Sequence, residues 1–126
     1  MRRGSRFQIG QSKTYLPIAR NTIEGINPDG TLILSDNGNT LASRGDTIQW
    51  IVGNNSGVAT ISSIHDTSSI DIFLPDPGKM PGNSSTWQGT INPNLSIPAQ
   101  ESYCIYYTKP GSTAVYMQDP IIRVDS

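Results

Sequence analysis

The sequence predicts an all-β domain of about seven or eight strands that form a β-sandwich. The hydrophobic content of 35% is low for a helical protein, and 12 glycines and 9 prolines are spread along the 126 residues. This composition is typical of short strands joined by turns. Alternating strand patterns recur at short intervals with turn residues between them. No window keeps a 3.6-residue apolar period, so no long helix is expected.

The first half of the chain is expected to supply four strands. Asn27-Pro28-Asp29-Gly30 predicts a turn after the first strand, because proline fixes φ and glycine accepts a positive φ. Asp36-Asn37-Gly38-Asn39 predicts a second turn. Ile48 and Trp50 alternate with Thr47, Gln49 and Ile51, which places Trp50 in the core with an indole N–H that needs one partner. The four expected strands are Ile18–Ile26, Thr31–Leu34, Thr40–Ser43 and Thr47–Val52.

The second half is expected to supply four more strands around a long loop. Pro75–Ser85 is rich in proline and glycine, so neither a helix nor a central strand is expected there. The polar stretch from His65 to Ser69 predicts an exposed loop. Asp119-Pro120 is compatible with a strand that follows it, because proline at a strand start owes no ladder hydrogen bond. These four expected strands are Val58–Ile64, Thr86–Ile91, Ser102–Thr108 and Ile121–Val124.

Charge divides the chain into two parts. The first 20 residues carry five basic residues and no acid, and the rest carries the remaining four of 9 basic residues and all 10 acidic ones. We expect residues 1–17 to form a flexible basic arm and residues 18–126 to form the folded domain; an arm that contacts an anionic partner is the alternative. The chain has no apolar run of about 18 residues, so no transmembrane segment is expected. It begins with no apolar run of about 7–15 residues, so no signal peptide is expected either.

Three segments resemble the cupredoxin family of blue-copper proteins. SRGDTIQWIVGNNSG (residues 43–57) resembles the cupredoxin strand that follows a Gly-Asp turn and contains a tryptophan. NPNLSIPAQESYCIYYTKPG (residues 92–111) is similar to the later strand of alternating aromatic residues, and MQDPIIRVDS (residues 117–126) is similar to the closing strand. The resemblance spans residues 18–126. It implies a Greek-key β-sandwich of the cupredoxin type. It also favours an exported protein, and a cytosolic protein is the alternative.

The residues that the resemblance aligns with copper ligands are not copper ligands. A blue-copper site needs two imidazoles, one thiolate and a weak axial methionine. The resemblance puts Thr60 at the first histidine, Tyr107 at the cysteine and Met117 at the methionine, and residues 108–113 contain no second histidine. The chain has one histidine, His65, and one cysteine, Cys104. We therefore expect no type 1 copper site and no cofactor.

Other metal and catalytic sites are not indicated either. The side chain of Cys104 is expected on the opposite strand face from that of Tyr107, and a buried structural thiol is expected. Asp36, Asp66, Asp71 and Asp76 are scattered along the chain, and no calcium-binding loop pattern joins them. No nucleophile elbow or phosphate-binding glycine loop occurs. The chain is therefore expected not to be an enzyme.

The leading hypothesis is a non-catalytic binding or structural module with a cupredoxin-like fold. Its recognition surface is expected at the loop end, with an unknown protein or glycan as partner and no nucleic acid, because the body is acidic. The residues expected at this surface are Thr60, Trp87, Tyr107, Lys109 and Met117.

Two other functions and one mode of assembly stay open. A copper-handling or electron-transfer protein would use Cys104 or Met117 with His65. A carbohydrate-binding module would stack sugars on aromatic side chains, with Trp87 the most exposed; the candidates are Trp87, Tyr103, Tyr106, Tyr107 and Tyr116. A homodimer through an unpaired edge strand is also compatible with an open sandwich.

Overall fold

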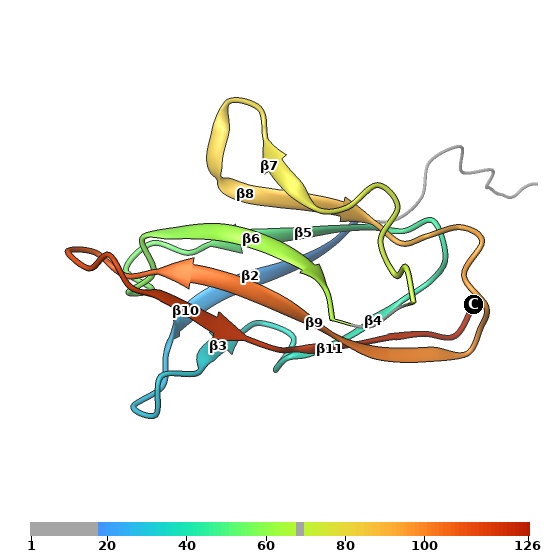
Figure 1. The fold of residues 1–126 in the computed structure, drawn as a ribbon, viewed down its shortest axis with the longest axis horizontal. Helices are drawn as coiled ribbons and strands as arrows, with labels where there is room; N and C mark the ends of the chain where they lie inside the picture. The colour runs from blue at the N-terminus through green and yellow to red at the C-terminus, as the bar shows by residue number, and fades with distance from the viewer. Residues whose placement is uncertain (1–17, 68–69) are drawn as a thin grey trace, which may run out of the picture.

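The computed structural model describes residues 18–67 and 70–126, and these residues form an all-β sandwich of two mixed sheets (Figure 1). No helix occurs within them, and so none that could cross a membrane. The predicted fold class is thus confirmed. The proposed basic arm, residues 1–17, lies outside the described residues.

One sheet, called here the β9 sheet, runs in the order β10-β9-β11-β4, with β6 paired to the other edge of β9. On one edge of β9, β10 pairs with its C-terminal half and β11 pairs with its N-terminal half. β11 pairs with β4 in parallel. The strands are β4 (Asn39–Ala42), β6 (Thr60–Asp66), β9 (Ala99–Thr108), β10 (Val115–Gln118) and β11 (Ile121–Val124).

The second sheet, called here the β5 sheet, runs in the order β3-β2-β5-β8-β7. Its β2 and β5 are parallel neighbours, and its other pairs are antiparallel. The strands are β2 (Ile18–Ile26), β3 (Leu32–Leu34), β5 (Thr47–Val52), β7 (Gly78–Met80) and β8 (Asn83–Thr90).

The described residues contain ten strands rather than seven or eight. The eight expected strands are present, with ends shifted by a few residues. β7 and the start of β8 lie inside the segment expected to be a loop, and β10 was not expected. β7 forms because it is an edge strand, where proline-flanked backbone needs only one partner. β6 extends through His65 and Asp66, so the loop expected at His65 begins two residues later.

The core lies between the sheets and centres on three fully buried aromatic residues. Trp50 on β5 and Tyr103 on β9 face each other across the sandwich, and Phe73 packs edge-on against both, with ring centroids 5.6 and 5.7 Å away. The indole N–H of Trp50 donates a 3.1 Å hydrogen bond to the Tyr103 hydroxyl, which supplies the partner expected from the sequence. Burial raises the pKa of Tyr103 to about 12, so this hydroxyl stays protonated at physiological pH.

Candidate functional site

Three strands meet at the loop end of the β9 sheet. The N-terminus of β6 and the N-terminus of β10 both pair with the C-terminus of β9, where Thr108 faces Thr60 on one side and Val115 on the other. The Thr60 and Thr108 hydroxyls lie 2.8 Å apart. Thr60, Tyr107, Lys109 and Met117 therefore all lie on or next to these paired strand ends.

Tyr107 forms the base of this loop end rather than its surface. Its side chain is 1% exposed, and its hydroxyl donates a 2.7 Å hydrogen bond to the Gly30 carbonyl in the β2–β3 turn. Its ring stacks on Tyr116 at a centroid distance of 5.7 Å, and the Lys109 ammonium lies 4.3 Å from the centre of the Tyr116 ring. Burial raises the pKa of Tyr107. These contacts fix the β9–β10 loop onto the β2–β3 turn.

We expect Tyr107→Phe to lower the free energy of unfolding by about 1 kcal/mol, because it removes the hydrogen bond to Gly30 and keeps the ring stacked on Tyr116. Urea unfolding measures the change. The matched control is Tyr116→Phe, since the Tyr116 hydroxyl makes no hydrogen bond within the described residues. Equal losses in both variants would contradict the role given to the Tyr107 hydroxyl.

Met117 does not face the same side of the sheet as Tyr107. Tyr116 is the residue opposite Tyr107, and Met117 pairs with Tyr106. Because side chains alternate along a strand, Met117 points to the outer face of the β9 sheet while Tyr107 points into the core. Met117 is accordingly 51% exposed. Thr60, Tyr107 and Met117, the residues that the resemblance aligns with copper ligands, therefore do not point to one common site.

The expectation that Trp87 is exposed at the recognition surface is wrong. It is 8% exposed, lies on β8 in the β5 sheet and faces Trp50 on β5. The expectation assumed that a long loop precedes Trp87, whereas β8 begins at Asn83 and places the indole in the core. Trp87 therefore does not join the other four residues at the loop end.

The histidine and the cysteine are cross-strand partners. His65 on β6 lies opposite Cys104 on β9, so both side chains are on the outer face of the β9 sheet. Cys104 is buried and His65 is exposed, with its ring stacked on Tyr106 at a centroid distance of 5.3 Å. Cys104 and Tyr107 face opposite sides, as expected. The pairing of His65 with Cys104 depends on the register of β6 against β9, so it could not be predicted from the sequence.

The five aromatic residues suggested for sugar stacking do not form an exposed row. Three of them are buried, and the two half-buried ones, Tyr106 and Tyr116, face opposite sides of the β9 sheet. A depression of about 450 Å³ lies between β3 and β10 and is lined by the aliphatic residues of β3 and by polar residues such as Asn27, Asn37 and Gln118. Its lining includes no aromatic ring, so it lacks the stacking surface that the carbohydrate hypothesis requires.

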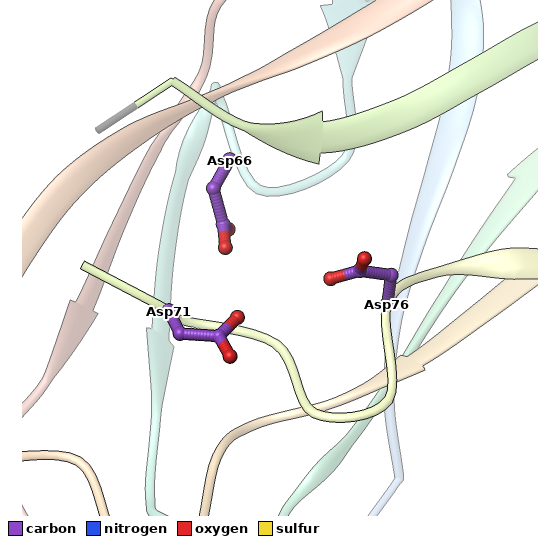
Figure 2. Close-up of side chains that lie close together, drawn as sticks. All are labelled: Asp66, Asp71 and Asp76. Carbon is purple, nitrogen blue, oxygen red and sulfur yellow. The ribbon is translucent and has the colours of Figure 1, made fainter. Parts of the chain in front are cut away.

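Sequence reasoning missed a cluster of three carboxylates. Asp66 at the end of β6 and Asp71 and Asp76 in the β6–β7 loop place carboxylate oxygens within 4.8 Å of one another. Figure 2 shows the three side chains pointing into one shared space. The expectation that these aspartates are scattered is therefore wrong. Their regular spacing of five residues was the available signal, but convergence needs the loop to fold back.

Contacts with the β8–β9 connection hold the β6–β7 loop in this position. Phe73 forms a β-bridge with Ile91, and the Asn92 backbone N–H donates a 2.8 Å hydrogen bond to the Ile72 carbonyl. The Asn92 side chain donates a 2.9 Å hydrogen bond to the Asp71 carbonyl. These contacts turn the loop so that its two aspartates face Asp66.

Of the three aspartates, Asp66 has the environment that most disfavours a negative charge. One of its oxygens, Oδ2, accepts a 3.1 Å hydrogen bond from the Ile72 backbone N–H, and the other, Oδ1, is buried without a partner among the described residues. Burial raises the pKa of Asp66 to about 6, and the negative charges of Asp71 and Asp76 add to the rise. Near neutral pH the cluster therefore holds closely spaced carboxylates without a compensating basic group in the interactions that the structure describes.

Oxygen donors of this kind suit hard divalent cations such as Ca²⁺, which take about six to eight oxygen ligands. Three carboxylates supply part of such a shell. The same arrangement is also explained without a cation, because protonation of Asp66 near pH 6 relieves the repulsion.

No protein-family model and no curated protein matches this chain.

Proposed function

We propose that this chain is a cupredoxin-like, Greek-key β-sandwich that forms no type 1 copper site and serves as a non-catalytic binding module. The resemblance of residues 43–57, 92–111 and 117–126 to cupredoxin strands supports the family assignment. The two mixed sheets support it at the level of architecture, with β9 between β6, which lies three strands earlier in the chain, and the two strands that follow it.

The position of the two strong donor side chains carries this proposal. The chain has one imidazole and one thiol, and both lie on the outer face of the β9 sheet at the His65–Cys104 pair. This pair is four residues along β9 from the Thr60–Thr108 pair, or about 14 Å from the loop end at about 3.4 Å per residue. The loop end itself offers hydroxyl and ammonium groups, which are poor ligands for copper.

The recognition surface is the exposed β9–β10 loop on its fixed base. Residues 110–115 are all exposed, and the loop is held by two internal hydrogen bonds, Ser112 N–H to the Lys109 carbonyl at 3.2 Å and Ala114 N–H to the Ser112 hydroxyl at 3.1 Å. Binding residues are commonly carried on loops that a rigid scaffold positions. With Lys109 as its charged group, this loop fits a polar or anionic protein surface.

A second candidate, a copper-handling protein with a non-standard site, has one observation in its favour. His65 and Cys104 are direct cross-strand partners, and side chains in such pairs lie within reach of one another. Met117 lies on the same outer face, but it pairs with Tyr106 on the far side of β9 from β6. This site would have two close donors and would take Cu(I) in preference to a type 1 cupric centre.

Copper titration of the reduced protein distinguishes the two proposals. For the binding module we expect no intense thiolate–copper absorption band with Cu(II), and no rise in Tm with Cu(I) beyond that of a Cys104→Ala control. A Tm rise that both His65→Ala and Cys104→Ala abolish would instead establish the second candidate. An intense visible band from a single bound Cu(II) would contradict the absence of a type 1 site.

A further inference from the structure

The depression of about 450 Å³ between β3 and β10, called here the β3–β10 depression, lies between free edges of the two sheets. β3 is the last strand of the β5 sheet, and β10 is an edge strand of the β9 sheet. Across the gap the Leu32 backbone N–H of β3 donates a 3.2 Å hydrogen bond to the Gln118 side chain of β10. Edge strands present backbone N–H and C=O groups with which another segment of chain can pair.

Two carboxylates are bonded to residues that line this depression. Asp29, in the β2–β3 turn, accepts hydrogen bonds of 2.6 and 3.0 Å from the hydroxyl and the backbone N–H of Thr31, a lining residue. These bonds lower the pKa of Asp29, so it is charged at neutral pH. Asp36, in the β3–β4 turn, accepts a 2.9 Å hydrogen bond from the backbone N–H of Gly38, another lining residue.

Asp119 adds a third carboxylate to the rim of the β3–β10 depression. It is exposed and directly follows Gln118, whose side chain is bonded to β3. On its other side, the Ile121 backbone N–H donates a 2.8 Å hydrogen bond to the Gly38 carbonyl. These two bonds hold the β10–β11 turn, with Asp119, beside the depression.

The rim has no basic partner in residues 18–67 and 70–126. None of the basic side chains in these ranges lines the depression, and the ion pair found within them joins Arg123 to Asp125. Lys109 lies on the β9–β10 loop, where its ammonium contacts the Tyr116 ring rather than a carboxylate. An acidic rim around a polar and aliphatic lining fits a basic segment of chain.

The chain itself contains such a segment in residues 1–17, outside the described residues. This segment has four basic residues and no acid, whereas residues 18–126 have five basic and 10 acidic residues. The two parts therefore have net charges of +4 and −5 and attract each other. Arg2, Arg3 and Arg6 lie among the first nine residues, together with Phe7 and Ile9, whose side chains suit the aliphatic residues of β3.

The length of this segment is sufficient to reach the rim. Leu32 pairs with Ile26, which is eight residues along β2 from Ile18, or about 27 Å at about 3.4 Å per residue. An extended chain spans at most about 3.5 Å per residue. Arg6 can therefore lie up to about 42 Å from Ile18, but Lys13 only up to about 18 Å. The three arginines can reach the rim near Leu32, and Lys13 cannot.

We propose that residues 1–9 dock in the β3–β10 depression of the same chain, with their arginines against the carboxylates of its rim and their backbone beside the free edge of β3. Exposed ion pairs are individually weak. A segment that is tethered to its own binding site, however, has a high effective concentration, so a few such pairs are enough to favour the docked state.

Trypsin, which cleaves after arginine and lysine, tests this proposal on the full chain at low salt. We expect cleavage after Arg6 to be at least about fivefold slower than in a free peptide of residues 1–17, because docking protects this bond. About 0.5 M NaCl should remove most of the protection, since salt screens exposed ion pairs.

The rim variant Asp29→Asn with Asp119→Asn should bring cleavage after Arg6 to within about twofold of the free peptide. Both side chains are exposed, and asparagine keeps an acceptor for Thr31, so the fold should tolerate the changes. Cleavage after Lys13 is the internal control. Its rate should be the same in the unmodified chain and in the rim variant, because Lys13 cannot reach the depression.

The matched control variant is Asp71→Asn with Asp76→Asn, which removes the same charge from the cluster of three aspartates and should keep Arg6 protected. Equal rates at Arg6 in the full chain and in the free peptide would overturn the proposal. Protection that the control variant removes and the rim variant keeps would also overturn it, because the segment would then dock at the aspartate cluster. Protection that grows with protein concentration would indicate docking on a second copy and would overturn docking within one chain.

Discussion

Phe73→Ala is expected to lower the free energy of unfolding by about 3–5 kcal/mol, the largest effect predicted for this protein. Phe73 is fully buried and packs edge-on against Trp50 and Tyr103. Its removal would leave a cavity at the centre of the aromatic core. Because a domain is usually stable by only about 5–15 kcal/mol, a loss of this size would leave the variant partly unfolded near body temperature.

Urea unfolding followed by tryptophan fluorescence measures this effect, since Trp50 is a direct neighbour of Phe73. The matched control is Leu74→Ala at the next position, where the side chain is 47% exposed and the expected loss is below about 1 kcal/mol. Similar losses at both positions would show that the β6–β7 loop does not contribute Phe73 to the core.

Asp66→Asn is expected to stabilise the protein at pH 7 and to leave it almost unchanged at pH 4. The pKa of Asp66 in the folded state is raised to about 6 from its usual 3.8, so the folded state binds this proton more tightly than the unfolded state does. The stability that comes from this group is therefore fully present below about pH 4 and is lost as the pH rises through 6. Because Asp66 is partly solvated, we expect a gain of about 1 kcal/mol at pH 7 rather than the full value of the shift.

Asparagine preserves the acceptor for the Ile72 N–H and removes the charge that faces Asp71 and Asp76. The measurement is the free energy of unfolding of both proteins at about pH 4, 5.5 and 7 in the presence of a chelator. These pH values cover the titration of Asp66. Asp119→Asn, an exposed aspartate outside the cluster, is the control and should not change the pH dependence. An Asp66→Asn variant that is less stable at every pH would contradict the repulsion between the carboxylates.

Added Ca²⁺ gives a separate readout of the same cluster. If a cation neutralises the three aspartates, Ca²⁺ should raise the Tm of the unmodified chain and not that of Asp66→Asn. If protonation alone relieves the repulsion, Ca²⁺ should change neither protein.

Much of the strand pattern could be predicted because its causes are local. The alternation around Trp50 and the turns at residues 27–30 and 36–39 depend on neighbouring residues only, and the structure has strands and turns where they were expected. β7 and β10 were missed because they are short edge segments. β7 is a strand because it pairs with β8, and β10 is a strand because it pairs with β9. Their own residues do not predict these pairings.

The candidate site was less predictable because it depends on register and on loop packing. A shift of one residue along β10 would exchange Tyr116 and Met117, so the direction of Met117 is decided by the pairing with β9. Trp87 was misplaced for a similar reason, since its burial follows from its position opposite Trp50. The three aspartates meet only because Phe73 and Ile72 anchor their loop to the β8–β9 connection.

The amino-acid sequence by itself determined the all-β class, the order of most strands and the number of strong metal donors, one imidazole and one thiol. These properties are set by composition, alternation and turn chemistry, which act over a few residues. Only the tertiary structure decided that His65 lies opposite Cys104, that Asp66 joins Asp71 and Asp76, and that Met117 and Tyr107 face opposite sides of the β9 sheet. Those features arise from contacts between segments far apart in the chain, whose geometry is fixed when the two sheets pack.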